Sequence, residues 1–222
     1  MQITGDAVRQ QLEECSRKGF HILSPEIRVL TAFDRIPLID FLILDVDGTL
    51  TDGKITFNSE GEEFKSFHVH DGMGIKLWQQ AGKEIAIITA RRSKIVEHRA
   101  KELGIRHVYQ GFADKQLAIT DLIQKTGVTP ERLAYMGDDL NDLAAMKFCS
   151  ISLCPANAVD FVKIHCDFKQ TIAGGEGAVR EAIDFLLDKM DLLVGLMNRF
   201  NQTHTMEALE SAFPKKNQRG DQ

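Results

Sequence analysis

Residues 41–53 read FLILDVDGTLTDG, an apolar run followed by closely spaced acidic residues and glycines. It opens with four apolar residues, and a short run that is apolar on both faces is typical of a parallel strand covered by helices on either side. Asp45 and Asp47 follow the run, and residues two positions apart in an extended chain point the same way. The carboxyl end of such a strand is where open α/β sheets bind ligands. Gly48 lets the backbone turn sharply there, so that nearby N–H groups can face a phosphate.

Further apolar runs resemble this strand and alternate with helical stretches. We predict strands over residues 84–89, 106–109, 133–136 and 150–153, and helices over residues 73–80, 93–103, 115–125 and 139–146. Strands that alternate with helices in this way are typical of a doubly wound α/β fold with a parallel, Rossmann-like sheet.

Residues 54–69 interrupt that alternation. Apolar Ile55, Phe57, Phe64 and Phe67 lie on either side of the turn signal at residues 58–61. This pattern predicts a β-hairpin that projects after the first strand. Its apolar side chains would be unfavourable on the surface of a monomer.

Length and composition narrow the class of protein. A chain of 222 residues fits one α/β domain with extensions at its ends. A net charge of −5 argues against long-range attraction to nucleic acid or to anionic lipid. No apolar run reaches the ~18 residues of a membrane span, and the first residues lack the apolar core of a signal peptide. We therefore expect a cytoplasmic protein that binds neither nucleic acid nor membrane.

The four cysteines do not indicate a metal site. Cys15, Cys149, Cys154 and Cys166 form no CxxC pair and have no histidine at zinc spacing. We expect reduced, partly buried thiols.

The pattern along the chain predicts a core of residues 39–188 between two extensions. Residues 1–38 are a helical N-terminal extension, and residues 189–222 are a C-terminal helix followed by a polar tail. A heptad seam runs into that helix, and its members are Val179, Ile183, Leu186, Met190, Leu193, Met197 and Phe200. Such a seam indicates a helix that docks either on its own domain or on the helix of another subunit.

Polar residues beside the other strand ends complete a candidate site. The Thr89 hydroxyl can bind a phosphate oxygen or cap the next helix, and Lys115 supplies a compact cation suited to a phosphoryl group. Asp138, Asp139 and Asp142 place three carboxylates within five positions. They repel one another unless a cation lies among them, and Mg²⁺ prefers such oxygen ligands. The macrodipole of the following helix stabilises acidic residues near the helix N-terminus, and it could explain one of the three carboxylates without a metal.

This order of motifs resembles the haloacid dehalogenase superfamily of phosphatases. The resemblance covers about residues 40–188, and it rests on six segments: residues 45–53, 67–74, 88–93, 109–111, 137–142 and 174–181. It implies a phosphoric monoester hydrolase with the fold described above. Only about 35 residues separate Gly53 from Thr89, which agrees with branches of the superfamily that lack a large cap domain.

The resemblance also implies a mechanism. Asp45 would be the nucleophile that becomes an aspartyl phosphate, and Asp47 would be the general acid and base. Mg²⁺ would be held by Asp45, by the backbone carbonyl of Asp47 and by Asp138. Thr89 and Lys115 would hold the phosphoryl oxygens.

Supporting and substrate-binding residues follow from the same resemblance. Asp142 would orient Lys115, and Asp139 would join the outer shell of the metal. The expected substrate-binding residues are Gly48, Thr49, His70, Gly72, Ala90 and Arg91.

The motifs are most similar to a branch that acts on phosphates of eight-carbon sugar acids in lipopolysaccharide synthesis. Close relatives in this branch often have arginine where His70 and Glu176 stand, so a nine-carbon sialic-type acid 9-phosphate is an alternative substrate. A catalytically silent oligomerisation module is a second alternative. The branch implies a homotetramer in which the hairpin shields a neighbouring site and the Gly174-Gly175 segment reaches a neighbouring subunit.

Overall fold

A six-stranded parallel sheet forms the centre of the molecule. The structure, a computed structural model, describes residue 27 and residues 29–199. The strands lie in the order β5-β4-β1-β6-β7-β8, and every pairing is parallel. Their bounds are β1 (Phe41–Leu44), β4 (Glu84–Thr89), β5 (His107–Gln110), β6 (Leu133–Met136), β7 (Ile151–Cys154) and β8 (Phe168–Lys169). β1 is therefore central, and the doubly wound α/β prediction is confirmed.

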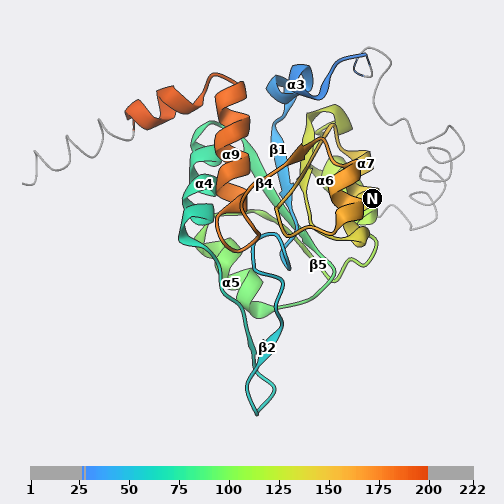
Figure 1. Cartoon of the computed structure of the whole chain (residues 1–222), viewed down its shortest axis with the longest axis vertical. Coiled ribbons are helices and arrows are strands. Elements are labelled where there is room, and N and C mark those ends of the chain that lie inside the picture. Colours follow the sequence, from blue (N-terminus) through green and yellow to red (C-terminus); the bar gives the residue numbers. More distant parts are fainter. Residues whose placement is uncertain (1–26, 28, 200–222) are drawn as a thin grey trace, which may run out of the picture.

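Helices cover both faces of this sheet, as Figure 1 shows with α4 and α9 on one side and α6 and α7 on the other. One face carries α4 (Val69–Gln80), α5 (Lys94–Glu102) and α9 (Ala178–Lys189), and the other carries α6 (Lys115–Thr126), α7 (Leu143–Phe148) and α8 (Asp160–His165). β1 shows why two cores form: Leu42 and Leu44 belong to one, and Phe41 and Ile43 to the other. Side chains alternate along a strand, so a strand between two helical layers is apolar throughout.

The predicted elements differ from the observed ones mainly at their ends. Helix α4 begins at Val69, four residues before the predicted start at Met73. The helix predicted over residues 139–146 is split into a 3₁₀ turn, η3 (Leu140–Asp142), and α7, because Asp139 caps that turn and Asp142 bonds back to its start. The prediction omitted α8 and β8, which form a sixth strand and its connection at the sheet edge. Another 3₁₀ turn, η2 (Pro130–Arg132), leads into β6.

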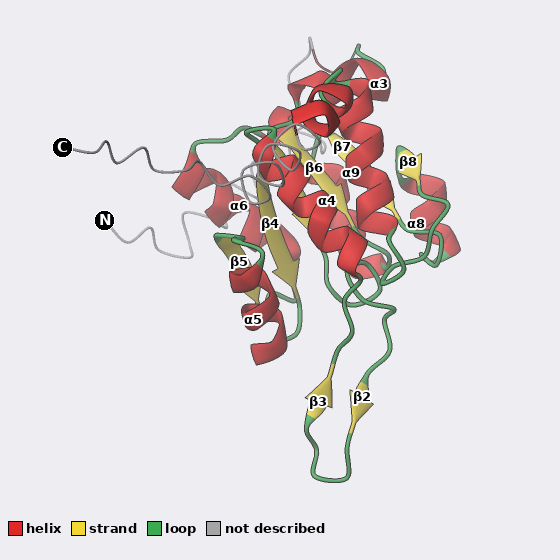
Figure 2. Cartoon of the chain, turned by 90° about the vertical axis from the view of Figure 1, so that its left-hand side faces the viewer, coloured by secondary structure: helices red, strands yellow, loops and turns green. Residues whose placement is uncertain are grey.

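The predicted hairpin is present. Strands β2 (Thr56–Phe57) and β3 (Glu63–Phe64) pair antiparallel, and Figure 2 shows them extending well beyond the sheet. The side chains of Ile55, Phe57 and Phe64 are each about half exposed. Between Gly53 and the start of β4 the chain holds only this hairpin and α4, so there is no large cap domain.

The seven-residue seam does not form one continuous helix. Helix α9 ends at Lys189, and Asp191 has a φ of +57°, a left-handed conformation that interrupts a helix. The chain is helical again over residues 193–199. Val179, Ile183 and Leu186 are fully buried in the core of their own domain, which is the docking that the first of the two readings predicted. Phe200 lies outside the described residues.

Part of the N-terminal segment lies on the domain. Helix α3 (Ala32–Arg35) is capped by Thr31, and a 3₁₀ turn, η1 (Ile36–Leu38), follows it. Ile36 is fully buried in the core. Residues 1–26 and 28 lie outside the described residues, so the domain boundaries at residues 38 and 188 stay predictions.

Candidate active site

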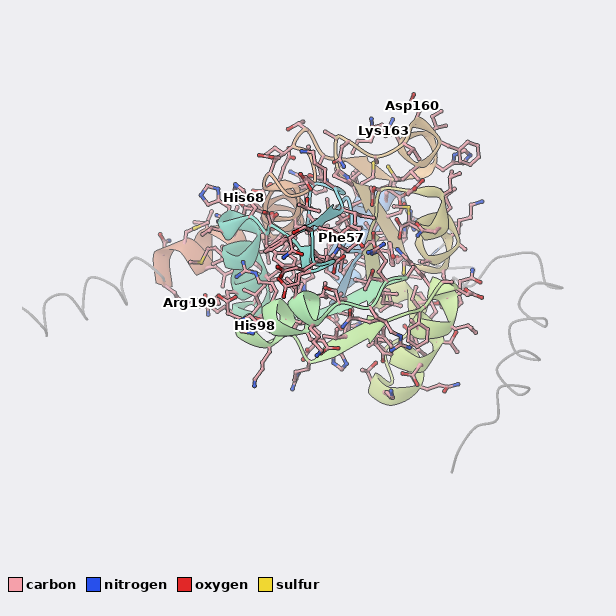
Figure 3. All side chains as sticks on the ribbon, turned by 90° about the horizontal axis from the view of Figure 1, so that it is seen from below. Phe57, His68, His98, Asp160, Lys163 and Arg199 are labelled. Carbon is pink, nitrogen blue, oxygen red and sulfur yellow. The ribbon has the colours of Figure 1, made fainter. Side chains whose placement is uncertain are left out.

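The carboxyl ends of four neighbouring strands bring the predicted catalytic groups to one edge of the sheet. Asp45 follows β1, Thr89 ends β4 and Asp138 lies two residues after β6. Lys115 is the first residue of α6, the helix after β5. Figure 3 views the molecule from this edge, and Phe57 of the hairpin lies near the middle of the view. The chain therefore builds the site where parallel strands end.

The loop after β1 is fixed by its own backbone. The amides of Thr49, Leu50 and Thr51 all donate to the carbonyl of Val46. Gly48 has a φ of +96°, and a Cβ atom on it would lie 2.0 Å from Oδ2 of Asp138. Only glycine suits this position, because it adopts the conformation without strain and leaves the space that the Asp138 carboxylate occupies.

Lys115 lies between two buried carboxylates. Its Nζ donates to Oδ1 of Asp45 at 2.7 Å and to Oδ1 of Asp142 at 2.6 Å. The Lys115 side chain is 1% exposed, although a lone lysine at a helix start is usually a surface residue. Burial alone lowers the pKa of Lys115, but the two carboxylates outweigh it and raise that pKa, so the ammonium stays charged.

Asp142 is saturated with donors. It accepts from the Tyr135 hydroxyl at 2.7 Å and from the amides of Asp138 and Asp139 at 3.0 and 3.1 Å, in addition to Lys115. A carboxylate with four donors is held in one orientation. These contacts suit the predicted role of orienting Lys115.

Three acidic side chains of the site, with Asp142 among them, lie close enough together to hold a divalent cation. Oxygens of Asp45, Asp138 and Asp142 lie within 4.8 Å of one another. Burial, then the charge of Asp142, raises the pKa of Asp45 and of Asp138 to about 7, although Lys115 lowers both. Carboxylates that are this costly to ionise gain most from a cation, and hard oxygen ligands with room for water suit Mg²⁺.

Asp47 has a different environment, which the sequence did not reveal. It forms an ion pair with Lys65, whose side chain is 1% exposed, and lies 3.8 Å from Arg91. Lys65 and Arg91 in turn contact Glu63, at 3.4 and 3.0 Å. The base of the hairpin thus faces Asp47 with two cations. The sequence contained no signal for this role of Lys65, because β3 has only two residues and cannot show which face is buried.

The other predicted site residues differ in their contacts and in their exposure to solvent. The Thr49 hydroxyl donates to Asp138 at 3.4 Å, and the Thr89 hydroxyl accepts from the Arg91 amide at 3.3 Å, with half-buried Ala90 between them. Asp139 is exposed and caps η3. His70 is exposed, with its ring against that of His68.

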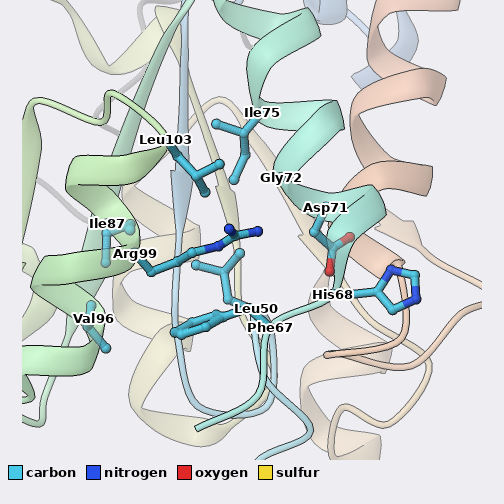
Figure 4. Close-up of a pocket in the computed structure, with 10 residues that line it drawn as sticks. All are labelled: Leu50, Phe67, His68, Asp71, Gly72, Ile75, Ile87, Val96, Arg99 and Leu103. Atoms are coloured by element: carbon cyan, nitrogen blue, oxygen red, sulfur yellow. The ribbon is translucent and has the colours of Figure 1, made fainter.

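Gly72 lies beside a small apolar cavity between α4 and α5 (Figure 4). A Cβ atom on it would lie 2.6 Å from the Arg99 guanidinium, which extends into this cavity above Phe67. This packing explains the glycine without a ligand.

The Gly174-Gly175 segment packs on the loop after β1 of its own chain, and its reach to a neighbouring subunit stays a prediction. A Cβ atom on Gly174 would lie 1.9 Å from the carbonyl oxygen of Gly48. Asn157 bridges the two, since its Nδ2 donates to that carbonyl at 3.0 Å and its Oδ1 accepts from the Gly174 amide at 2.6 Å. Asn157 could not be predicted from the sequence, because its contacts join segments that are far apart along the chain.

Comparison with known proteins agrees with this geometry. Residues 105–183 match a family model described as haloacid dehalogenase-like hydrolase. The chain is 47% identical over 149 residues to 3-deoxy-D-manno-octulosonate 8-phosphate phosphatase from Escherichia coli K12, covering 67% of this chain and 79% of that protein. The chain belongs to the haloacid dehalogenase superfamily.

Solved structures within the superfamily support the same assignment. One is the 3-deoxy-D-manno-octulosonate 8-phosphate phosphatase of Moraxella catarrhalis in complex with magnesium ion, phosphate ion and KDO, with a TM-score of 0.74 and 39% identity over 76% of this chain and 97% of that one. Another is the cobalt-bound phosphatase of Haemophilus influenzae, with a TM-score of 0.70 and 40% identity over 72% and 93% of the two chains. This superfamily member is a phosphoric monoester hydrolase, and its acidic cluster fits the Mg²⁺ that phosphatases of the superfamily use. Among its described helices, none is long and apolar enough to cross a membrane.

Proposed function

We propose that this protein hydrolyses 3-deoxy-D-manno-octulosonate 8-phosphate to the free sugar acid and inorganic phosphate, in lipopolysaccharide sugar synthesis. The observation that carries the proposal is the convergence of Asp45, Lys115 and Asp138 with Asp47 beside them. The eight-carbon substrate is supported by the names of relatives that are 39–47% identical.

In the first step Asp45 attacks phosphorus and the ester oxygen leaves. The attack needs an ionised carboxylate, and Lys115 favours that form against the effect of burial. Asp47 donates a proton to the leaving oxygen, so that an alcohol departs instead of an alkoxide. Lys65 and Arg91 hold Asp47 at the mouth of the site.

In the second step the aspartyl phosphate is hydrolysed. Asp47, now ionised, takes a proton from a water molecule, whose oxygen attacks phosphorus and releases the Asp45 carboxylate. Lys115 and the Thr89 hydroxyl are placed to donate to the phosphoryl oxygens in both steps. Asp45, the Asp47 carbonyl and Asp138 would hold Mg²⁺, which supplies positive charge against the nucleophile and the phosphate.

The nine-carbon alternative rests on Glu176 and His70. Glu176 is exposed, and a negative charge there does not favour an anionic sugar. His70 is exposed on the first turn of α4, at a position where close relatives often have arginine. The silent-module alternative is disfavoured by the intact arrangement of Asp45, Lys115 and Asp138.

Phosphate release from a substrate panel tests the proposal. The panel contains the eight-carbon and nine-carbon sugar-acid phosphates and simple hexose phosphates, each with Mg²⁺ and with EDTA. Asp45→Asn is the inactive control, and Asp121→Asn, a change on the exposed side of α6, is the matched control. We expect metal-dependent preference for the eight-carbon acid that is lost only in Asp45→Asn. Preference for the nine-carbon acid phosphate would show that it is the substrate instead of the eight-carbon one. No phosphate release by folded protein would favour the oligomerisation module.

We also propose that the protein is a cytoplasmic homotetramer. The exposed Ile55, Phe57 and Phe64 of the hairpin form an apolar surface that a second subunit could cover. Light scattering of the wild type and of Phe57→Ser/Phe64→Ser measures the mass. A monomeric wild type would contradict the tetramer.

A further inference from the structure

Two thiols outside the catalytic centre lie in direct contact. Sγ of Cys154 lies 3.2 Å from Sγ of Cys166, across a loop of twelve positions. Cys154 ends β7, and Cys166 follows α8, the helix that Figure 3 marks with Asp160 and Lys163. A disulfide needs the sulfurs about 2.05 Å apart, so a movement of about 1 Å closes the bond.

We propose that Cys154 and Cys166 form a reversible disulfide by exchange with low-molecular-weight disulfides such as glutathione disulfide. Nothing in the phosphatase mechanism uses either thiol. The exchange modifies two side chains outside the catalytic centre, and the proposal does not depend on which substrate the enzyme hydrolyses.

The two cysteines have different positions and therefore different roles. Cys154 is fully buried, whereas Cys166 is partly exposed. The two sulfurs share a hydrogen bond in which either can be the donor; this contact lowers the pKa of Cys166, and nearby Lys169 lowers it further. The same hydrogen bond and burial raise the pKa of Cys154. Cys166 is thus the attacking group, because the thiolate is the nucleophile and must be reached by the disulfide.

The exchange balances in two steps. The Cys166 thiolate attacks one sulfur of glutathione disulfide, that S–S bond breaks, and one glutathione thiolate leaves and is protonated by water. Cys154 then loses its proton to solvent, attacks the Cys166 sulfur and expels the second glutathione. The two cysteines are oxidised to a disulfide, and one glutathione disulfide is reduced to two glutathiones.

The bond would fasten the segment that supports the catalytic loop. The chain leaves Cys154 through Asn157, which holds Gly48 and Gly174, and Val159, whose amide donates to the Asp138 carbonyl at 2.9 Å. A disulfide at the start of this segment ties it to the strand beyond β7. Closing a loop of this length reduces the freedom of the unfolded chain, so the oxidised protein should melt at a higher temperature.

Trypsin cleaves the native chain so that the two thiols fall in different peptides. Cleavage after Lys147, Lys163 and Lys169 gives one peptide of residues 148–163 and another of residues 164–169. The full chain is prepared with Cys15→Ser, which removes the thiol outside the described residues. It is incubated with glutathione disulfide, blocked with an alkylating agent, and measured by intact mass and by peptide mapping, with and without dithiothreitol.

The variants distinguish the roles of the thiols. We expect the Cys15→Ser protein to lose two hydrogens and to yield the two peptides joined, and dithiothreitol to reverse both. Cys149→Ser, which removes a buried thiol from the same peptide as Cys154, should behave identically. Cys154→Ser should stop at one glutathione on Cys166, and Cys166→Ser should gain none.

Several outcomes would overturn the proposal. They are unlinked peptides in the folded parent, loss of the link in Cys149→Ser, or glutathione on Cys154 in Cys166→Ser. The phosphatase assay does not enter this readout, so failure of the proposed function leaves the test intact.

Discussion

Replacing Gly48 by alanine tests how closely the loop after β1 is fitted to the predicted metal ligand. A Cβ atom there would lie 2.0 Å from Oδ2 and 2.4 Å from Cγ of Asp138. Real Cβ atoms approach no closer than 3.0 Å, so the Asp138 carboxylate must move by about 1 Å (3.0 − 2.0 Å). The alanine also has to adopt a φ near +96°, which costs about 1–2 kcal/mol.

A second glycine separates these two effects. Gly61, in the hairpin turn, has a φ of +82° and has no atom within 4 Å of its Cβ position. Gly61→Ala therefore carries the backbone strain of about 1–2 kcal/mol without the displacement. Misplacement of a catalytic group by 1 Å can cost about 10²-fold in rate, and this loss should fall on Gly48→Ala alone.

Steady-state kinetics with a Mg²⁺ titration measures the difference. We expect kcat/KM of Gly48→Ala to fall about 10²-fold and its apparent Mg²⁺ affinity to fall about 10-fold or more. Urea denaturation should show the loss from backbone strain in both variants and a larger loss in Gly48→Ala, which also displaces Asp138. If Gly48→Ala matches Gly61→Ala in both kinetics and Mg²⁺ affinity, the close approach of Gly48 and Asp138 has no catalytic importance.

Three further changes test other parts of the site and fold. Lys115→Met leaves buried carboxylates without their cation, so we expect kcat to fall about 10²–10³-fold and the free energy of unfolding to fall by about 3 kcal/mol; full activity would contradict this. Lys65→Met removes the ion pair that holds Asp47, and kcat should fall more than KM changes, whereas Lys54→Met on the exposed hairpin should change neither. Burial raises the pKa of Asp71 above its ordinary 3.8, so the folded protein retains a proton that the unfolded chain releases, and stability falls as pH rises through that window. Asp71→Asn should remove this fall in urea denaturation, and an unchanged slope would refute the assignment.

The order of the catalytic groups was predictable because a parallel sheet converts sequence order into spatial proximity. Each apolar run ends in a polar residue, and strands that run in one direction bring those ends to one edge. This rule places Asp45, Thr89, Lys115 and Asp138 at one edge of the sheet, and the resemblance to the haloacid dehalogenase superfamily supplied their expected roles.

Residues outside the regular alternation could not be found in this way. Lys65 follows a strand of only two residues, too short to establish which face is buried. Asn157 acts through a contact across 109 positions. The seam after Val179 kept its heptad spacing through Asp191, yet the backbone there is left-handed, and periodicity of side chains does not report a change in φ.

The charge of the site explains why a protein of net charge −5 can bind a phosphate monoester. Asp45, Asp47, Glu63, Asp138 and Asp142 contribute five negative charges when ionised, and Lys65, Arg91 and Lys115 contribute three positive ones. Burial is the main cause that raises the pKa of Asp45 to about 7, and the charge of Asp142 raises it further, so part of this shift reflects the imbalance of two charges. One divalent cation would cancel it, so the same ion would ionise the nucleophile and remove the repulsion that a phosphate dianion otherwise meets. Binding of inorganic phosphate should therefore require Mg²⁺, and calorimetry that detects equal phosphate affinity in EDTA would contradict this account.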